Sequence, residues 1–413
     1  MAHIKPFRAL RPYREYVSRV ASCAYDVIEY DEALRIAERN ELTFLRVSRS
    51  EIDLPHDTDP YDIRVYEKAK ENLSALREKK IMFQEREPCF YVYRQALAGH
   101  VQEGIVACVS IDEYLSGTIK KHELTRADKE ADRTRHFATV NAQTGPVFLA
   151  YRSSDIINQV VDSVVKTTPE YDFEADDSIR HTAWVIRDAR TIDAVRNAFE
   201  NVGSMYIADG HHRAASAAAI ALLRRANNPG FTGDEEYNSM LAVLFPHDRL
   251  NVLAYNRVVR DLNGLSVKDF MKRVSRNFHV SEAEKSGVAA SIHHIGIYAA
   301  GKWYDCAVRE KYLAGTTMVK TLDVSILHDY LLKPILRIGD VRRDERIGFV
   351  GGIKGMGALE RCVDSGEYAV AFSLYPVTLE QLMAVSDSGE IMPPKSTWFE
   401  PKLRSGIFVH LLE

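Results

Sequence analysis

The chain has 413 residues, of which 46% are hydrophobic and 27% charged, and its formal net charge is −4 at pH 7. This length predicts about two domains, and the composition excludes a largely disordered chain. The net charge argues against a surface that mainly neutralises nucleic-acid phosphates, but it allows a local basic pocket. Five scattered cysteines and no apolar run near the roughly 20 residues of a membrane helix predict a cytoplasmic protein with reduced thiols and no membrane partner.

The first part of the chain alternates short apolar runs with amphipathic segments, which is typical of a mixed α/β fold. In chain order we expect a strand at 43–47, a helix near 60–79, paired strands in CFYVYRQAL and GIVACVSI, a helix within HELTRADKEADRTRHFATVNA, the strand PVFLAY, the helix SDIINQVVDSVVKTT and the strand HTAWVIR.

The strand SMYIA and the helix AASAAAIALLRRANN then enclose a polar turn made of Asp209, Gly210, His211, His212 and Arg213. Free N–H groups in the first turn of a helix favour an anion, above all a phosphate. Arginine can bind phosphate through two hydrogen bonds, the histidines can donate or ligate, and the aspartate can hold Mg²⁺ or orient a histidine. A plain polar helix start with a capping aspartate is the alternative. A zinc site is less favoured, because no carboxylate or cysteine stands nearby at ligand spacing.

Beyond residue 236 a second set of elements begins with YNSMLAVLF, so we expect domains at 1–235 and 236–413. The second set continues with a helix near 266–277, strands near 292–310, the helix DVSILHDYLLKPIL, the strand YAVAFSL, a further helix and an irregular tail, MPPKSTWFEPKLRSG. Loops with this many specific polar residues often serve a site, so Lys395, Ser396 and Thr397 could approach the same anion. The alternative is a terminal strap that packs Trp398 and Phe399.

Three groups of residues carry a resemblance to known families. The segment ADGHHRAASAAAI resembles the signature of the ParB/sulfiredoxin-like superfamily and, within it, the ADP-dependent free serine kinases, whose turn also reads DGHHR. Lys121, His122 and Glu123 resemble the K-P-H-E segment that carries the catalytic glutamate of those kinases, with Lys121 at the proline position. Over its length the chain resembles the domain of unknown function 1015 family, through the pieces PFRALRP, AYDVI, HELT, DRTRHFATVNAQTGPVFLAY, YIADGHHRAASAA, LDVSILH and MPPKSTWFEPKLRSG.

The resemblance implies a ParB/sulfiredoxin-like mixed-sheet core of the α/β (mixed α+β) class, followed by a second α+β domain. It also implies a nucleotide-dependent phosphotransferase that acts on free serine, phosphoserine or a similar small hydroxy acid, with Mg²⁺ and with ADP or ATP as donor. Glu123 would be the general base and Asp209 the second catalytic or metal-facing carboxylate. The phosphates would bind at Gly210, His211, His212 and Arg213.

Three further residues are candidates for substrate binding. His122 follows from the kinase-like segment. Asp26, in YDVI, stands at a strand or turn end where its carboxylate can point into a cleft, although an Asx-turn explains it nearly as well. Arg133 could touch phosphate or form a surface ion pair with a neighbour on its helix.

Two other functions remain open from the sequence. The same pocket could hydrolyse phosphoserine or a nucleotide, with Glu123 activating water. A ParB-like nucleotide-binding regulatory module belongs to another class, but neither a helix-turn-helix nor a basic surface is evident, so we expect no nucleic-acid partner. The sequence leaves open whether the chain forms a homo-oligomer.

Overall fold

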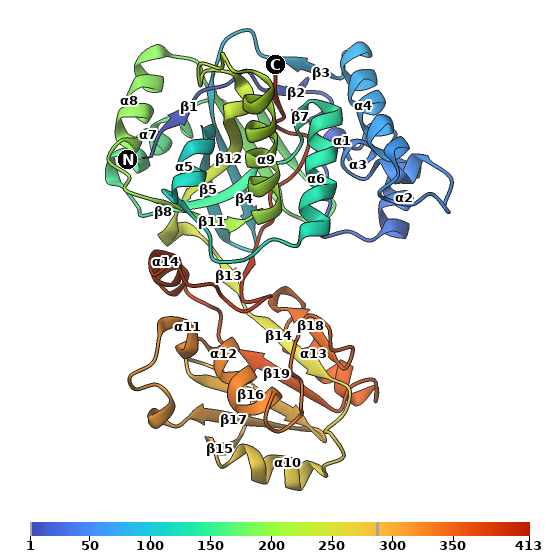
Figure 1. The fold of residues 1–413 in the computed structure, drawn as a ribbon, viewed down its shortest axis with the longest axis vertical. Coiled ribbons are helices and arrows are strands. Elements are labelled where there is room, and N and C mark those ends of the chain that lie inside the picture. The colour runs from blue at the N-terminus through green and yellow to red at the C-terminus, as the bar shows by residue number, and fades with distance from the viewer. Residues whose placement is uncertain (1, 286–288) are drawn as a thin grey trace. The chain divides into compact units, whose positions relative to one another are not determined.

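The computed structural model describes residues 2–285 and 289–413, which divide into two compact units (Figure 1). The first unit runs to Leu250 and also contains Pro401–Glu413, and the second is Asn251–Glu400. This division differs from the expected boundary at residues 235 and 236. The strand in YNSMLAVLF pairs with two strands of the first unit and therefore belongs to it, and the last residues return to that unit as well. None of the helices in the described ranges has the length and apolar character needed to cross a membrane.

A mixed sheet forms the centre of the first unit. In the described part of the chain its nine strands are, in spatial order, β6 (Ile119–Lys120), β11 (Met205–Asp209), β8 (Val147–Tyr151), β12 (Ser239–Pro246), β5 (His100–Ser110), β4 (Phe90–Leu97), β10 (Arg180–Ile186) and β9 (Tyr171–Glu174), with β1 (Ile4–Lys5) beside β5. β11 runs parallel to β6 and antiparallel to β8, whereas β12 runs parallel to β8 and antiparallel to β5. The predicted mixed α/β fold is thus confirmed.

The helices between residues 111 and 227 contribute to the apolar core around this sheet, whereas the earlier helices of the first unit pack in separate apolar clusters. The helices of the first unit are α1 (Val17–Val20), α2 (Tyr30–Arg39), α3 (Leu45–Ser48), α4 (Ile63–Glu78), α5 (Ile111–Ser116), α6 (Ala127–Val140), α7 (Asp155–Val164), α8 (Ala189–Phe199) and α9 (His211–Asn227). α9 packs against α5 and α6 and lies over β8 and β12, because its alanines allow a close approach (Figure 1). The strand expected at 43–47 is wrong: residues from Leu45 onward form α3, whose packing against α4 overrides the β-propensity of a short apolar run.

Short strand pairs connect the remaining segments of the first unit. β2 (Leu10–Pro12) pairs with β3 (Met82–Gln84), and β7 (Ala142–Gln143) pairs with β21 (His410–Leu411) near the end of the chain. β21 gives the returning segment a backbone anchor. At Gly406, where φ is 84°, a Cβ would lie 2.6 Å from Phe44, so the segment passes too close to Phe44 for a side chain.

The second unit is built on an antiparallel sheet. Its strands are, in spatial order, β15 (Phe278–Ala283), β17 (Lys302–Val308), β16 (His294–Ala299), β19 (Val370–Leu374), β14 (Tyr255–Val259) and β18 (Ile347–Gly351), and β13 (Val252–Leu253) pairs separately with β20 (Trp398–Phe399). Its helices are α10 (Val267–Val274), α11 (Met318–Thr321), α12 (Asp323–Leu327), a π-helix at His328–Leu332, α13 (Met356–Asp364) and α14 (Leu379–Asp387).

Candidate active site

The turn between β11 and α9 has the expected position. β11 ends at Asp209, Gly210 has a φ of 94°, and α9 begins at His211. Only glycine adopts this backbone conformation without strain, and a Cβ there would lie 3.2 Å from the guanidinium carbon of Arg213. The register of β11 against β8 shifts between Ile207 and Asp209. Such an irregularity re-aims the side chains that follow it, here the Asp209 carboxylate.

Asp209 is the centre of an ion-pair network. Arg213 Nη2 donates to its Oδ2 at 2.8 Å, and Lys402 Nζ donates to its Oδ1 at 2.7 Å. The other terminal nitrogen of Arg213 donates to the backbone carbonyl of Pro146. Burial alone would raise the pKa of Asp209, but the charges of Lys402 and Arg213 outweigh it and hold that pKa well below its usual range. Asp209 is therefore ionised and carries two charge-assisted hydrogen bonds.

These contacts differ from the expected roles of Asp209 and Arg213. We expected the arginine to reach outward to phosphate and the carboxylate to face a metal ion. Instead, the Arg213 side chain is only 6% exposed and turns back under the turn, because Asp209 and the Pro146 carbonyl lie within its reach. Both carboxylate oxygens of Asp209 are in ion pairs. Arg213 thus positions Asp209 within the folded chain.

The N-terminus of α9 has no side-chain cap. Gly210 is the N-cap residue and lacks a side chain to accept from the first turn, and its carbonyl accepts the N–H of Ala214 at 3.0 Å. The alternative of a capping aspartate does not describe this turn, because Asp209 precedes the N-cap and bonds to cations. The first N–H groups of α9 therefore lie at the end of β11 together with the positive end of the helix dipole, an arrangement that favours an anion.

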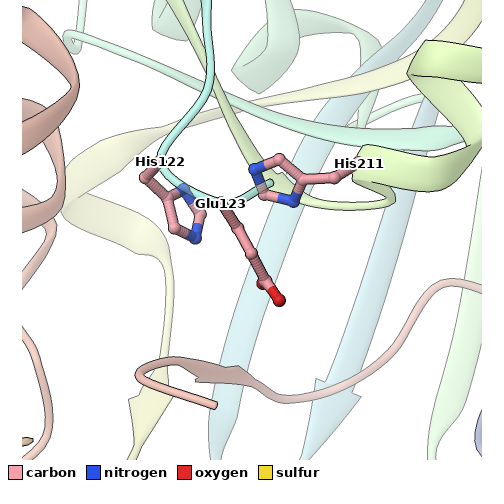
Figure 2. A group of neighbouring side chains, drawn as sticks. All are labelled: His122, Glu123 and His211. Atoms are coloured by element: carbon pink, nitrogen blue, oxygen red, sulfur yellow. The ribbon is translucent and has the colours of Figure 1, made fainter. Parts of the chain in front are cut away.

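The parallel pairing of β6 with β11 brings a second motif to the same turn. Met205 pairs with Ile119 and Tyr206 with Lys120, so His122 and Glu123 follow β6 at the level where β11 ends. The rings of His122 and His211 meet edge to face, with centroids 4.5 Å apart. Figure 2 shows the Glu123 side chain extending beside these two rings.

Both rings are buried and neutral. Burial lowers the pKa of His122 to about 4, and burial followed by the neighbouring His122 lowers the pKa of His211 well below its ordinary value. The backbone carbonyl of Ile207 is a hydrogen-bond partner of the His122 ring. His122 Nδ1 and His211 Nε2 have no partner among the described residues. One ligand atom from each of His122, Glu123 and His211 lies within 4.8 Å of the others.

This group corrects the expectation that no carboxylate stands near the histidines at ligand spacing. Glu123 is far from His211 in sequence, and the parallel pairing of β6 with β11 makes them neighbours. A two-residue strand such as β6 leaves no periodic signal, so the sequence could reveal this proximity only through the shared resemblance of both segments to one family.

The remaining predicted residues surround the turn. His212 Nε2 accepts from the backbone N–H of Arg126 at 3.1 Å, which ties α9 to the start of α6. Burial lowers the pKa of His212, and the charge of Asp26 opposes that shift, so Asp26 lies within electrostatic reach of the turn. Arg133 is buried rather than on the surface, stacks on Tyr25 at 4.3 Å and bonds Asp132.

The comparisons with known proteins place the chain in a family. Residues 4–325 match the family described as protein of unknown function (DUF1015). The chain belongs to this family. No curated protein matches it.

Solved structures resemble this DUF1015 protein distantly. A conserved hypothetical protein from Pyrococcus furiosus is 14% identical with a TM-score of 0.36, and the match covers 74% of this chain and 95% of that one. A free serine kinase in complex with AMP is 12% identical with a TM-score of 0.37, covering 73% and 91%. SbnI with a C-terminal truncation, from Staphylococcus aureus, is 11% identical with a TM-score of 0.39, covering 74% and 87%.

The C-terminal tail of this DUF1015 protein is divided between the two units. Lys395, Ser396 and Thr397 lie in the second unit, where the Lys395 carbonyl accepts from Arg257 at 2.8 Å and Ser396 Oγ donates to the Pro393 carbonyl at 2.6 Å. Their approach to the turn therefore stays a prediction.

Lys402, seven residues beyond Lys395, belongs to the first unit and is the tail residue that binds Asp209. The carbonyl of Lys402 accepts from Gln95 at 2.8 Å, which fixes its backbone on β4. Lys402 could not be singled out from the sequence, because nothing in the spacing separates it from the other basic residues of the tail.

Proposed function

We propose that this protein transfers a phosphoryl group between a nucleotide and the hydroxyl of free serine, phosphoserine or a similar small hydroxy acid. The observation that carries the proposal is the position of Glu123 beside His211, the first residue of α9. A carboxylate that can accept a proton thus lies next to an uncapped helix N-terminus that favours phosphate. Phosphoryl transfer requires this combination of anion binding and a base near the attacking hydroxyl.

Three charged residues at or beside the turn have roles in this proposal. The nucleotide phosphates bind at the first N–H groups of α9, from Gly210 to Arg213, with Mg²⁺ carried by the phosphates themselves. Lys402, whose side chain is 21% exposed, supplies positive charge beside them, and Asp209 holds it in place. Glu123 accepts the proton of the substrate hydroxyl.

The resemblance of both DGHHR and the segment around Glu123 to the free serine kinases supports serine as the acceptor and ADP or ATP as the donor. Asp26 and His122 are the proposed substrate contacts, since the charge of Asp26 reaches His212 and His122 lies against His211.

Phosphorus NMR tests the proposal. Wild-type protein is incubated with serine and ADP, ATP or inorganic phosphate, and separately with phosphoserine and AMP or ADP. We expect transfer with one nucleotide pair. Glu123→Gln should lower turnover by about 100- to 10,000-fold while nucleotide affinity is retained, because the amide preserves shape but cannot accept the proton. Isothermal titration of the nucleotide measures that affinity.

Glu174→Gln is the matched control, because Glu174 is an exposed carboxylate on β9 outside the turn, and it should keep full turnover. Unchanged turnover in Glu123→Gln would remove Glu123 as the base. Absence of transfer with every donor would overturn the phosphotransferase proposal. Phosphate release that needs no acceptor would instead identify a hydrolase, and nucleotide binding without any chemistry would identify a regulatory module.

A further inference from the structure

His122, Glu123 and His211 form the one group in the described ranges where three ligand-type side chains converge. Unpartnered buried histidine nitrogens occur elsewhere too, for example on His136 and His410, so one such atom is no sign of a ligand. Here two of them occur on rings that touch, beside a carboxylate. His122 is 2% exposed and His211 is 8% exposed, so water does not readily satisfy these nitrogens.

An unpartnered buried nitrogen costs free energy, roughly 1–3 kcal/mol for each group left unsatisfied. Two such atoms at one place are hard to explain by stability, because apolar side chains of similar size would avoid the cost. A cation bound among the three side chains would accept a lone pair from one nitrogen of each ring and an oxygen of Glu123.

We infer that His122, Glu123 and His211 form a binding site for a divalent first-row transition-metal ion of the Zn²⁺ type. Two imidazoles and one carboxylate are typical ligands of zinc and of ferrous iron, whereas Mg²⁺ and Ca²⁺ prefer oxygen ligands throughout. Three protein ligands leave a position open for water or for an oxygen of a substrate, as in catalytic rather than structural zinc sites. Glu123 cannot hold the ion and accept a proton at the same time, so the metal-bound state is distinct from the state in which Glu123 is the base of the proposed function.

The surroundings of the three side chains fit this ion. Metal-binding histidines usually hold their other ring nitrogen against a backbone carbonyl or carboxylate, and the Ile207 carbonyl has that place beside His122. Zinc–nitrogen distances of about 2.0–2.1 Å require the three donors to approach more closely than 4.8 Å. Glu123 is the least buried of the three residues.

Metal titration of the full chain tests this site. Protein freed of metal with a chelator is titrated with Zn²⁺ by calorimetry, with neither nucleotide nor serine present. We expect one Zn²⁺ per chain that excess Mg²⁺ does not displace. His122→Gln and His211→Gln should each lower the affinity by at least about 10- to 100-fold, the loss that removing even an outer-shell partner causes. His212→Gln is the matched control and should keep the affinity, because His212 lies outside the group.

Co²⁺ provides a second readout. Its visible absorption spectrum should show a site with nitrogen and oxygen ligands in the wild type and in His212→Gln, and this spectrum should be lost in His211→Gln. Circular dichroism shows whether each variant is folded. Equal Zn²⁺ affinity in the wild type and both ligand variants, or no binding below millimolar concentration, would overturn the site. Because no nucleotide is present, this result does not depend on whether the protein transfers phosphate.

Discussion

The residues at and around the turn fall into two halves, one centred on Asp209 and one on His122 and His211. The two halves differ in whether their buried polar groups are paired. In the Asp209 half, both carboxylate oxygens bond cations, and the guanidinium of Arg213 bonds a carboxylate and a carbonyl. In the histidine half, His122 and His211 each keep a buried nitrogen without a partner among the described residues. A fully paired network holds one geometry, whereas a buried ring nitrogen without a partner is a group that a ligand can satisfy. The Asp209 half is therefore held by its own ion pairs, whereas the histidine half retains ring nitrogens that the described residues do not satisfy.

The largest effect is expected when the two ion pairs of Asp209 are broken. Asp209→Asn should lower the free energy of unfolding of the first unit by on the order of 3–5 kcal/mol, because it leaves Arg213 and Lys402 as cations without their shared counter-charge. Urea denaturation in the presence of a chelator measures this change. His211→Leu should stay within about 1 kcal/mol of the wild type, because it removes an unsatisfied nitrogen and keeps apolar volume. Similar losses in both variants would erase the distinction between the two halves.

The two halves should also differ in the pH range over which they change the free energy of unfolding. His122 has a pKa of about 4 in the folded chain, against an ordinary value of 6.5, because it is buried. The unfolded chain therefore binds more protons between these values, and the free energy of unfolding falls as the pH drops from about 6.5 to about 4. The slope is at most about 1.4 kcal/mol per pH unit for each such histidine.

Asp209 responds in a lower window. Its folded pKa is depressed by Lys402 and Arg213 against the effect of burial, so its stabilisation is present above 3.8, the ordinary value, and is lost as the pH falls further. In chelated buffer, His122→Leu should flatten the profile between pH 6.5 and 4, and Asp209→Asn should flatten it below 3.8. Parallel profiles for the wild type and both variants would contradict this separation.

The smallest expected effect concerns Gly210, which joins Asp209 to His211. Gly210→Ala should cost about 1–2 kcal/mol of unfolding free energy, because alanine at a φ of 94° is strained and its Cβ would press on Arg213. Gly203→Ala is the control, since no atom lies within 4 Å of a Cβ there. Thermal unfolding of the two variants measures the difference, and equal melting temperatures would show that the turn tolerates a side chain.

The sequence predicted the parts of this molecule that have local signals. The strand, the glycine and the alanine-rich helix around Gly210 followed from periodicity and turn chemistry, and the structure has them at the same residues. The partners of that turn could not be predicted in this way. β6 is two residues long, and Lys402 is one basic residue in an irregular tail, so neither carries a pattern. The burial of Arg213 was missed because its spacing from Asp209 suits an outward arginine equally well.

Lys402 reaches Asp209 across 193 residues of chain. During synthesis the ribosome completes β11 and α9 long before it delivers this lysine, and the whole second unit is made in between. The nascent first unit therefore carries Asp209 with Arg213 alone, and the final charge arrives together with β21. The ion pair between Lys402 and Asp209 can therefore form only after the returning segment has been synthesised and has packed on the first unit.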